Sequence, residues 1–160
     1  MNPKDCGFSD KSGWFRYRAA AIIIEDGNVL VAKNDFDPYY YSVGGAVRLH
    51  ETAEDAVLRE AFEETGVRYE IERLAFIHEN FFIGTMGYKE QKYHEVAFYF
   101  LMKPNGVKIF NHTSYVLNGV PERVHWLPIN RLHEYTVYPA FYGEKLLNLS
   151  DKAEHIVTHE

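Results

Sequence analysis

Three carboxylates lie close together in one short stretch of the chain, at Glu60, Glu63 and Glu64. On a helix that turns by about 100° per residue, Glu60 and Glu64 share one stripe and Glu63 lies beside them. The same stripe begins with the small apolar residues of positions 53–57. Because the apolar half must pack against the body of the protein, we expect the acidic half to line a functional site.

A divalent cation is the expected partner of these acids. Glu60 and Glu64 are like charges four residues apart, which repel each other by about 0.2–0.5 kcal/mol in water and by more when partly buried. Magnesium prefers carboxylate oxygen and keeps positions for water and substrate phosphate. The sequence therefore predicts Mg²⁺, with Mn²⁺ as the alternative, and a backbone carbonyl of Gly44 or Gly45 as a further ligand. The simplest chemistry is attack by a water molecule that the metal activates.

The helix that carries these acids has recognisable ends. Thr52 is a good N-cap, and Gly66 suits the position just after the last turn. Arg59 can pair with Glu51 or with a neighbouring acid, or it can meet phosphate. Phe62 projects on the side opposite the stripe, which predicts apolar neighbours on both faces of a largely enclosed helix.

The other elements follow from hydrophobic pattern and turn residues. We predict a hairpin of residues 17–25 and 28–33, and a short strand at 39–43 before the glycines. Two long paired strands are expected at 69–83 and 93–102, joined by the connection 84–91. A further strand at 123–127, a short helical segment at 129–135 and a terminal helix at 138–149 follow. The order predicts an α/β fold in which helices pack on a mixed sheet.

Composition limits the classes of protein. With 160 residues and no linker or repeat, residues 1–160 are expected to form one domain, with less ordered ends at 1–14 and 151–160. A net charge of −6 argues against a stable complex with nucleic acid. One cysteine and no signal peptide or apolar span of membrane length predict a cytoplasmic protein without a membrane partner. Exposed aromatic residues leave a homodimer open.

The spacing around the acids resembles the complete signature of the Nudix (MutT-like) hydrolases. The matching residues are Gly45, Glu51 six positions later, and the run Arg59-Glu60-Ala61-Phe62-Glu63-Glu64-Thr65-Gly66-Val67. Seven fixed positions at this spacing match by chance in about one sequence in a million. Coincidence therefore does not account for the match.

This resemblance implies a fold and a set of roles. The fold would be an α/β/α sandwich with a mixed sheet and a loop-helix-loop box at residues 45–67. Glu60, Glu63 and Glu64 would bind the metal with a carbonyl of Gly44 or Gly45, and Glu63 could also act as the base. Arg59 and Glu51 would hold the loop. The enzyme would be a pyrophosphohydrolase that cuts the diphosphate bond of a small nucleotide, such as a nucleoside triphosphate or a nucleoside diphosphate linked to another group X.

Three positions depart from the common pattern of that family. His50 stands where Gly is frequent, Arg48 replaces a frequent acid, and Val43 precedes Gly44 where Pro is common. These departures concern the shape of the loop and its phosphate contacts rather than metal binding.

Residues outside the box choose the substrate, and the sequence predicts them less sharply. Lys33, Arg16, Arg18 and Arg48 could meet phosphates, and Tyr41 could stack on a base. Glu95 is the first candidate for an extra acid that serves as metal ligand or base. The alternatives are solvated charges, an aromatic of the sheet and a cross-strand ion pair. The neighbouring aromatics at positions 39, 40, 81 and 82 have the same two interpretations, and Glu79 is the second candidate acid.

Two other functions compete with hydrolysis of a small nucleotide. A catalytically silent, nucleotide-sensing module would keep the fold and bind nucleotides without metal-dependent turnover. Action on capped RNA ends is the third hypothesis, and the lack of a basic patch argues against it.

Overall fold

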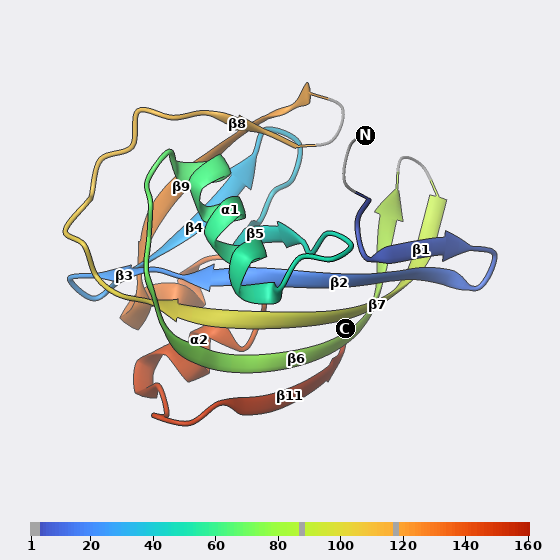
Figure 1. Cartoon of the computed structure of the whole chain (residues 1–160). Helices are drawn as coiled ribbons and strands as arrows, with labels where there is room; N and C mark the ends of the chain where they lie inside the picture. The colour runs from blue at the N-terminus through green and yellow to red at the C-terminus, as the bar shows by residue number, and fades with distance from the viewer. Residues whose placement is uncertain (1–3, 87–88, 117–118) are drawn as a thin grey trace.

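The computed structural model describes residues 4–86, 89–116 and 119–160, which form one mixed sheet flanked by helices (Figure 1). The strands are β1 (Gly7–Asp10), β2 (Gly13–Ile22), β3 (Ile24–Glu25), β4 (Asn28–Asn34), β5 (Tyr40–Ala46), β6 (Ile71–Met86), β7 (Lys89–Met102), β8 (Ser114–Tyr115), β9 (Pro121–Pro128), β10 (Val137–Tyr138) and β11 (Glu154–His159). The helices are α1 (Ala53–Thr65) and α2 (Tyr142–Lys145), with 3₁₀ segments η2 (Ile129–Glu134) and η3 (Leu146–Asn148).

The strand order of the sheet is β11-β6-β7-β2-β5-β4-β9-β8, with β1 beside β2, β10 beside β5 and β3 beside β4. The pairs β11 with β6, β2 with β7, and β10 with β5 are parallel, and the remaining neighbours are antiparallel. Figure 1 shows α1 lying across the sheet at β2 and β5, with α2 on the other side near β6. The expected α/β fold with a mixed sheet is therefore confirmed.

Strand β2 separates two hydrophobic cores, because successive side chains of a strand point to opposite faces. Ala19 and Ala21 pack under α1 in one core, together with Val43. Ala20 and Ile22 pack in the other core with residues of η2, α2 and η3. The small alanines let α1 approach the sheet closely, and this places the acidic end of the helix over β5.

Helix α1 has the ends that the sequence predicts. Thr52 adopts an extended conformation and its hydroxyl accepts a hydrogen bond from Asp55 N at 3.1 Å, while Gly66 ends the helix with φ 72°. The expected enclosure of both faces is only partly right, because Leu58 packs against the core but Phe62 does not. Phe62 is 40% exposed, and its ring is covered by the guanidinium of Arg68 at 4.5 Å. An aromatic ring can remain at the surface when a cation covers its face.

The predicted hairpin forms only at its tip. Strand β3 pairs with β4 at Ile24 and Val29, but the long strand β2 pairs with β5 on one side and with β7 on the other. Local turn residues specify the tip, whereas the partners of β2 depend on packing distant in sequence. The two long strands β6 and β7 pair as predicted and extend to Met86 and Lys89, so their connection is shorter than expected and residues 87–88 lie outside the described residues.

The C-terminal region differs from the predictions. The terminal helix expected at 138–149 is reduced to α2 and η3, because β10 occupies Val137–Tyr138. Glu154–His159, expected in a less ordered end, pairs as β11 in parallel with β6. The polar character of this segment led to that expectation, but Ile156 within β11 packs against the second core. At the other end, Gly7–Asp10 forms β1. None of the described helices is long and apolar enough to span a bilayer.

Candidate functional site

The candidate site lies where the acidic face of α1 meets Gly44 and Gly45, the pair called here the glycine loop. The sequence predicted a loop at these glycines, but both lie within strand β5 and pair with β2. Arg59 is the centre of the site, because this side chain contacts three of the predicted acids. Its Nε and Nη2 atoms donate to the two oxygens of Glu51 at 2.7 and 2.9 Å, and its Nη1 donates to Glu60 and to Glu63, the latter at 3.4 Å. Nη2 also donates to Ala46 O at 3.0 Å. This fork of hydrogen bonds fixes the loop to the helix.

The bond with Arg59 changes the acidity of Glu51. A hydrogen bond from the guanidinium is the main cause that holds the pKa of Glu51 below its usual value, and the backbone N–H of Arg48, 2.9 Å from Glu51 Oε2, contributes as well. Glu51 therefore stays ionised while it holds the loop.

Glu60 is pressed against the backbone of Gly45. A Cβ atom at Gly45 would overlap the carboxylate of Glu60, so glycine lets this side chain lie directly against β5. Burial raises the pKa of Glu60, and the hydrogen bond from Arg59 opposes this effect. The two residues predicted to serve a metal thus lie in direct contact.

Glu64 is the most deeply buried acid of the box. Its side chain is 6% exposed, Oε1 accepts a hydrogen bond from Gly44 N at 2.8 Å, and Oε2 is buried without a partner among the described residues. Burial raises its pKa well above the usual value, and the negative charge of Glu122 adds to the effect. An acid with a buried, unpartnered oxygen requires either a proton or a cation.

Glu122 is the residue that the sequence did not identify. It lies on β9, is 6% exposed, and accepts hydrogen bonds from Tyr41 Oη and from Ser114 Oγ, the latter at 2.9 Å. Tyr41 was expected to stack on a base, but its hydroxyl is occupied by Glu122, and burial followed by this hydrogen bond raises its pKa. No local pattern marked Glu122, because its approach to Glu64 depends on the packing of β9 against α1.

Arg18 holds the glycine loop from the side opposite α1. Its Nη1 donates to Ser42 Oγ at 2.8 Å, and its Nη2 donates to Ser42 O at 2.7 Å and to Gly44 O at 3.3 Å. Gly44 has φ 147°, and a Cβ there would overlap the backbone of Ala19. Arg18, predicted to meet phosphate, is therefore beside the site but binds the loop in this structure.

The loop before α1 brings Arg48 to the acids. Arg48 Nη2 lies 3.7 Å from Glu63 Oε1, which places a cation at the edge of the carboxylate cluster. His50 adopts φ 69° in the left-handed region, at one of the positions where this sequence departs from the usual glycine. The loop thus has the backbone shape that glycine favours, although it carries an imidazole.

Two other predicted residues lie away from the box acids. Glu95 is 4% exposed and forms an ion pair with Arg16 on the neighbouring strand. Lys33 lies 5.0 Å from the ring centre of Tyr40 and lines a separate groove that includes Arg123. The second candidate acid, Glu79, pairs with His155 at 2.8 Å.

The aromatic residues predicted as candidates for base stacking also lie in different parts of the molecule. Tyr40 packs edge-on against His125 and Tyr135, whereas Phe81 and Phe82 line a groove at the end of the sheet. Tyr40 therefore serves packing within the protein, which is the second of the two interpretations that the sequence left open.

The carboxylate oxygens of Glu60, Glu63 and Glu64 are donors of the kind that a hard divalent cation prefers. No three acidic, His or Cys side chains converge closely enough to hold a metal ion within residues 4–86, 89–116 and 119–160. Arg59 contacts both Glu60 and Glu63, so its charge offsets the repulsion between these two acids. The unpartnered Oε2 of Glu64 supplies a free oxygen ligand.

Comparisons with known proteins find similar sequences and similar folds. The NUDIX domain model matches residues 15–145. A MutT-like protein of Streptomyces ambofaciens is 33% identical over 143 residues, which cover 89% of this chain and 81% of the relative. A MutT NUDIX hydrolase structure from Burkholderia pseudomallei has a TM-score of 0.52 at 24% identity and covers 72% of this chain and 84% of its own. A mutator MutT protein from Bacillus halodurans has a TM-score of 0.61 at 17% identity and covers 90% and 89%. These structures share the fold of this chain.

Proposed function

The chain belongs to the NUDIX domain family and is a Nudix hydrolase, and from this premise we propose that it cuts the diphosphate bond of a small nucleotide with the help of Mg²⁺. The substrate class is a nucleoside triphosphate or a nucleoside diphosphate linked to a further group. Glu64 carries this proposal, because a buried carboxylate with one unpartnered oxygen lies beside the glycine loop of the box.

Glu60, Glu63, Glu64 and the carbonyl of Gly45 would hold the metal. A bound Mg²⁺ supplies a water of lowered pKa and neutralises charge on the diphosphate oxygens. Manganese offers the same ligand preference and is the expected substitute.

The residues of the chain do the remaining work. Glu51 and Arg59 keep the loop against α1 through two hydrogen bonds of 2.7 and 2.9 Å. Glu63 is exposed at the surface of the cluster, so it can accept a proton from the attacking water. Arg48, at 3.7 Å from Glu63, supplies a positive charge at the edge of the carboxylate cluster, where it can offset negative charge on the bound substrate.

A substrate panel tests the proposal. Release of phosphate or diphosphate is measured from nucleoside triphosphates, including damaged forms, and from nucleoside diphosphate derivatives, each with Mg²⁺ and with EDTA. We expect turnover that requires the metal and that falls by well over tenfold in Glu64→Gln. Metal-independent turnover, or a Glu64→Gln variant with normal turnover, would contradict the assignment.

A second readout does not depend on activity. Binding of Mg²⁺ to the folded protein alone raises the free energy of unfolding, by about 2.7 kcal/mol at a metal concentration one hundred times Kd. We expect this rise in the natural protein and its loss in Glu64→Gln. Nucleotide binding without any metal-dependent turnover would instead identify a nucleotide-sensing module.

A further inference from the structure

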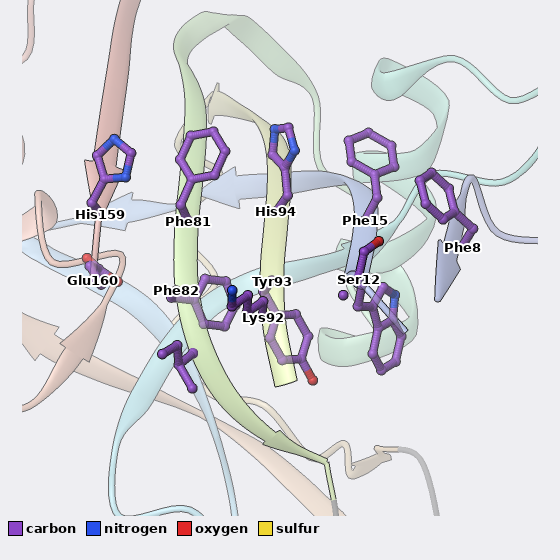
Figure 2. A pocket seen from close by; sticks show the side chains of 13 residues that line it. Phe8, Ser12, Phe15, Phe81, Phe82, Lys92, Tyr93, His94, His159 and Glu160 are labelled. Atoms are coloured by element: carbon purple, nitrogen blue, oxygen red, sulfur yellow. The ribbon is translucent and has the colours of Figure 1, made fainter. Parts of the chain in front are cut away.

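A groove of about 540 Å³ opens at the end of the sheet where β1, β2, β6, β7 and β11 come together (Figure 2). Its walls are mostly aromatic side chains, and Figure 2 shows them arranged as rows across neighbouring strands. The acids of the box do not line it. It is therefore a feature that the roles assigned above do not use.

One row consists of Trp14, Tyr93 and Phe82, which are direct neighbours on β2, β7 and β6. The indole and phenol rings stack with their centres 5.4 Å apart at 22°, and the phenol and phenyl rings stack at 4.6 Å and 6°. Beyond Trp14 the next strand presents Ser9, which is too small to cover the indole. Among the described residues, the outer face of Trp14 therefore lacks an aromatic neighbour in this row.

The opposite face of the sheet carries a second row, which is closed at the corresponding position. Phe15 and Phe81 lie on either side of His94, and Phe8 stacks on Phe15 with ring centres 5.6 Å apart. Because side chains of a strand alternate between faces, this row points toward the side of α1. The two rows have similar composition, but Ser9 leaves a stacking position in the first and Phe8 fills it in the second.

Positive charge follows the open row toward the candidate site. Arg16 lies two residues after Trp14 on the same face of β2, and its guanidinium carbon is 5.7 Å from the ring centre of Tyr93. Arg18 follows two residues later and donates to Gly44 O at 3.3 Å. Each such step along a strand is about 6.6 Å, so Trp14 and Arg18 are about 13 Å apart. Glu95 pairs with Arg16, which leaves one net positive charge on this strip.

We propose that this open row, Trp14, Tyr93 and Phe82, binds the planar base of the nucleotide substrate, with the phosphates directed past Arg16 toward Arg18 and Gly44. The inference rests on the proposed function and adds a site for the base to it. The aromatic end suits a flat ring, the cations suit phosphate, and their separation is comparable to the length of an extended nucleoside diphosphate. Stacking is sequence-tolerant because every base has a π face, so this site selects nucleotides and discriminates weakly between bases.

Fluorescence tests the site without any need for turnover. The chain has two tryptophans, so Trp126→Phe leaves Trp14 as the only indole. In this background the full-length protein is titrated with AMP, GMP, CMP and UMP. We expect a saturable change in Trp14 emission with similar Kd for the four nucleotides. Adding Tyr93→Leu should weaken binding by about 5- to 150-fold, since base stacking contributes about 1–3 kcal/mol.

Phe15→Leu is the matched control, because it makes the same kind of change in the closed row. It should leave the nucleotide Kd within twofold. Phe82→Leu repeats the test at a second position of the open row if Tyr93→Leu does not fold. Emission that responds to none of the four nucleotides, or equal Kd values in the open-row variant and its background, would overturn the inference.

Two alternatives to the base site give results that differ from those expected above. They are self-association of the chain through the open row, and hydrolysis of nucleotides that does not use the open row. Emission that changes with protein concentration and not with nucleotide would place a second copy of the chain on the open row, and would overturn the inference. Normal turnover with an unchanged KM in Tyr93→Leu would also overturn it while leaving the hydrolase proposal intact. A normal titration in a protein that hydrolyses nothing in the panel would contradict the hydrolase proposal and support the binding site.

Discussion

Glu64 and Arg18 bind the same residue from two sides of the sheet. Gly44 donates its N–H to Glu64 Oε1 at 2.8 Å and accepts from Arg18 Nη2 at 3.3 Å through its carbonyl. The glycine loop is therefore held by an acid from α1 and by a cation from β2. This arrangement fixes the loop before any substrate arrives, and it indicates which substitutions should separate stability from activity.

Glu64→Gln should stabilise the protein while it removes activity. Burial raises the pKa of Glu64, so its ionised form destabilises the folded state above the ordinary glutamate pKa of about 4.3. The amide of glutamine can still accept from Gly44 N. We expect the free energy of unfolding in EDTA to rise by on the order of 1–3 kcal/mol at pH 7.5, measured by urea denaturation.

The direction of the pH effect is part of this prediction. As pH rises from the ordinary pKa of glutamate through the raised pKa of Glu64, the natural protein loses stability that the variant keeps, so the advantage of the variant should vanish near pH 4. Glu63→Gln is the matched control, because Glu63 is exposed. An equal gain in both variants would rule out burial as the cause.

Gly44→Ala should destabilise the protein strongly. The residue has φ 147°, and a Cβ would overlap the backbone of Ala19, which cannot move independently of β2. We expect a loss of more than about 3 kcal/mol, measured by thermal unfolding. Gly106→Ala is the control, since Gly106 also has a positive φ but has open space around its Cβ position. A similar loss in the two variants would show that φ alone, and not contact, limits Gly44.

Arg59→Lys should loosen the loop. Lysine cannot reproduce the two parallel hydrogen bonds to Glu51 or the third to Ala46 O. We expect stability to fall by about 2–3 kcal/mol at pH 7 and kcat/KM to fall with it. Because the pKa of Glu51 is lowered, its stabilising contribution is present above pH about 4.3 and is lost as pH falls below that value.

The difference in the free energy of unfolding between Arg59→Lys and the natural protein should therefore become smaller at acid pH. Arg68→Lys, at an exposed arginine that covers Phe62, should change stability by less than about 0.5 kcal/mol. A difference that stays constant with pH would contradict the role given to Glu51.

His50→Gly should stabilise the loop before α1. His50 has φ 69°, where a residue with a Cβ is strained by about 1–2 kcal/mol relative to glycine. Part of this gain is offset by the greater freedom of glycine in the unfolded chain, so we expect a net rise of about 0.5–1 kcal/mol. His50→Ala removes the imidazole and keeps the strain, and it should show no such rise. The comparison of the three proteins by urea denaturation separates backbone strain from side-chain contacts.

Local signals predicted α1 almost to the residue, because Thr52 and Gly66 determine its ends through their own hydrogen bonding and backbone conformation. The contact of Gly45 with Glu60 also follows from spacing, since one loop separates them. The approach of Glu122 to Glu64 was missed, because these residues are 58 positions apart and meet only through the stacking of β9 near α1. The pairing of Glu95 with Arg16 likewise depends on a parallel register that no sequence pattern encodes.

Strand β5 belongs to both halves of the sheet. Residues 43–46 pair with β2, and Ser42 and Tyr41 pair with β4, while β10 pairs with the start of the strand. Opening the glycine loop would therefore separate two hydrophobic cores at once, so its amide protons should exchange with solvent only through global unfolding. Any gating of substrate entry must then come from side chains, not from a hinge in the backbone at these two glycines.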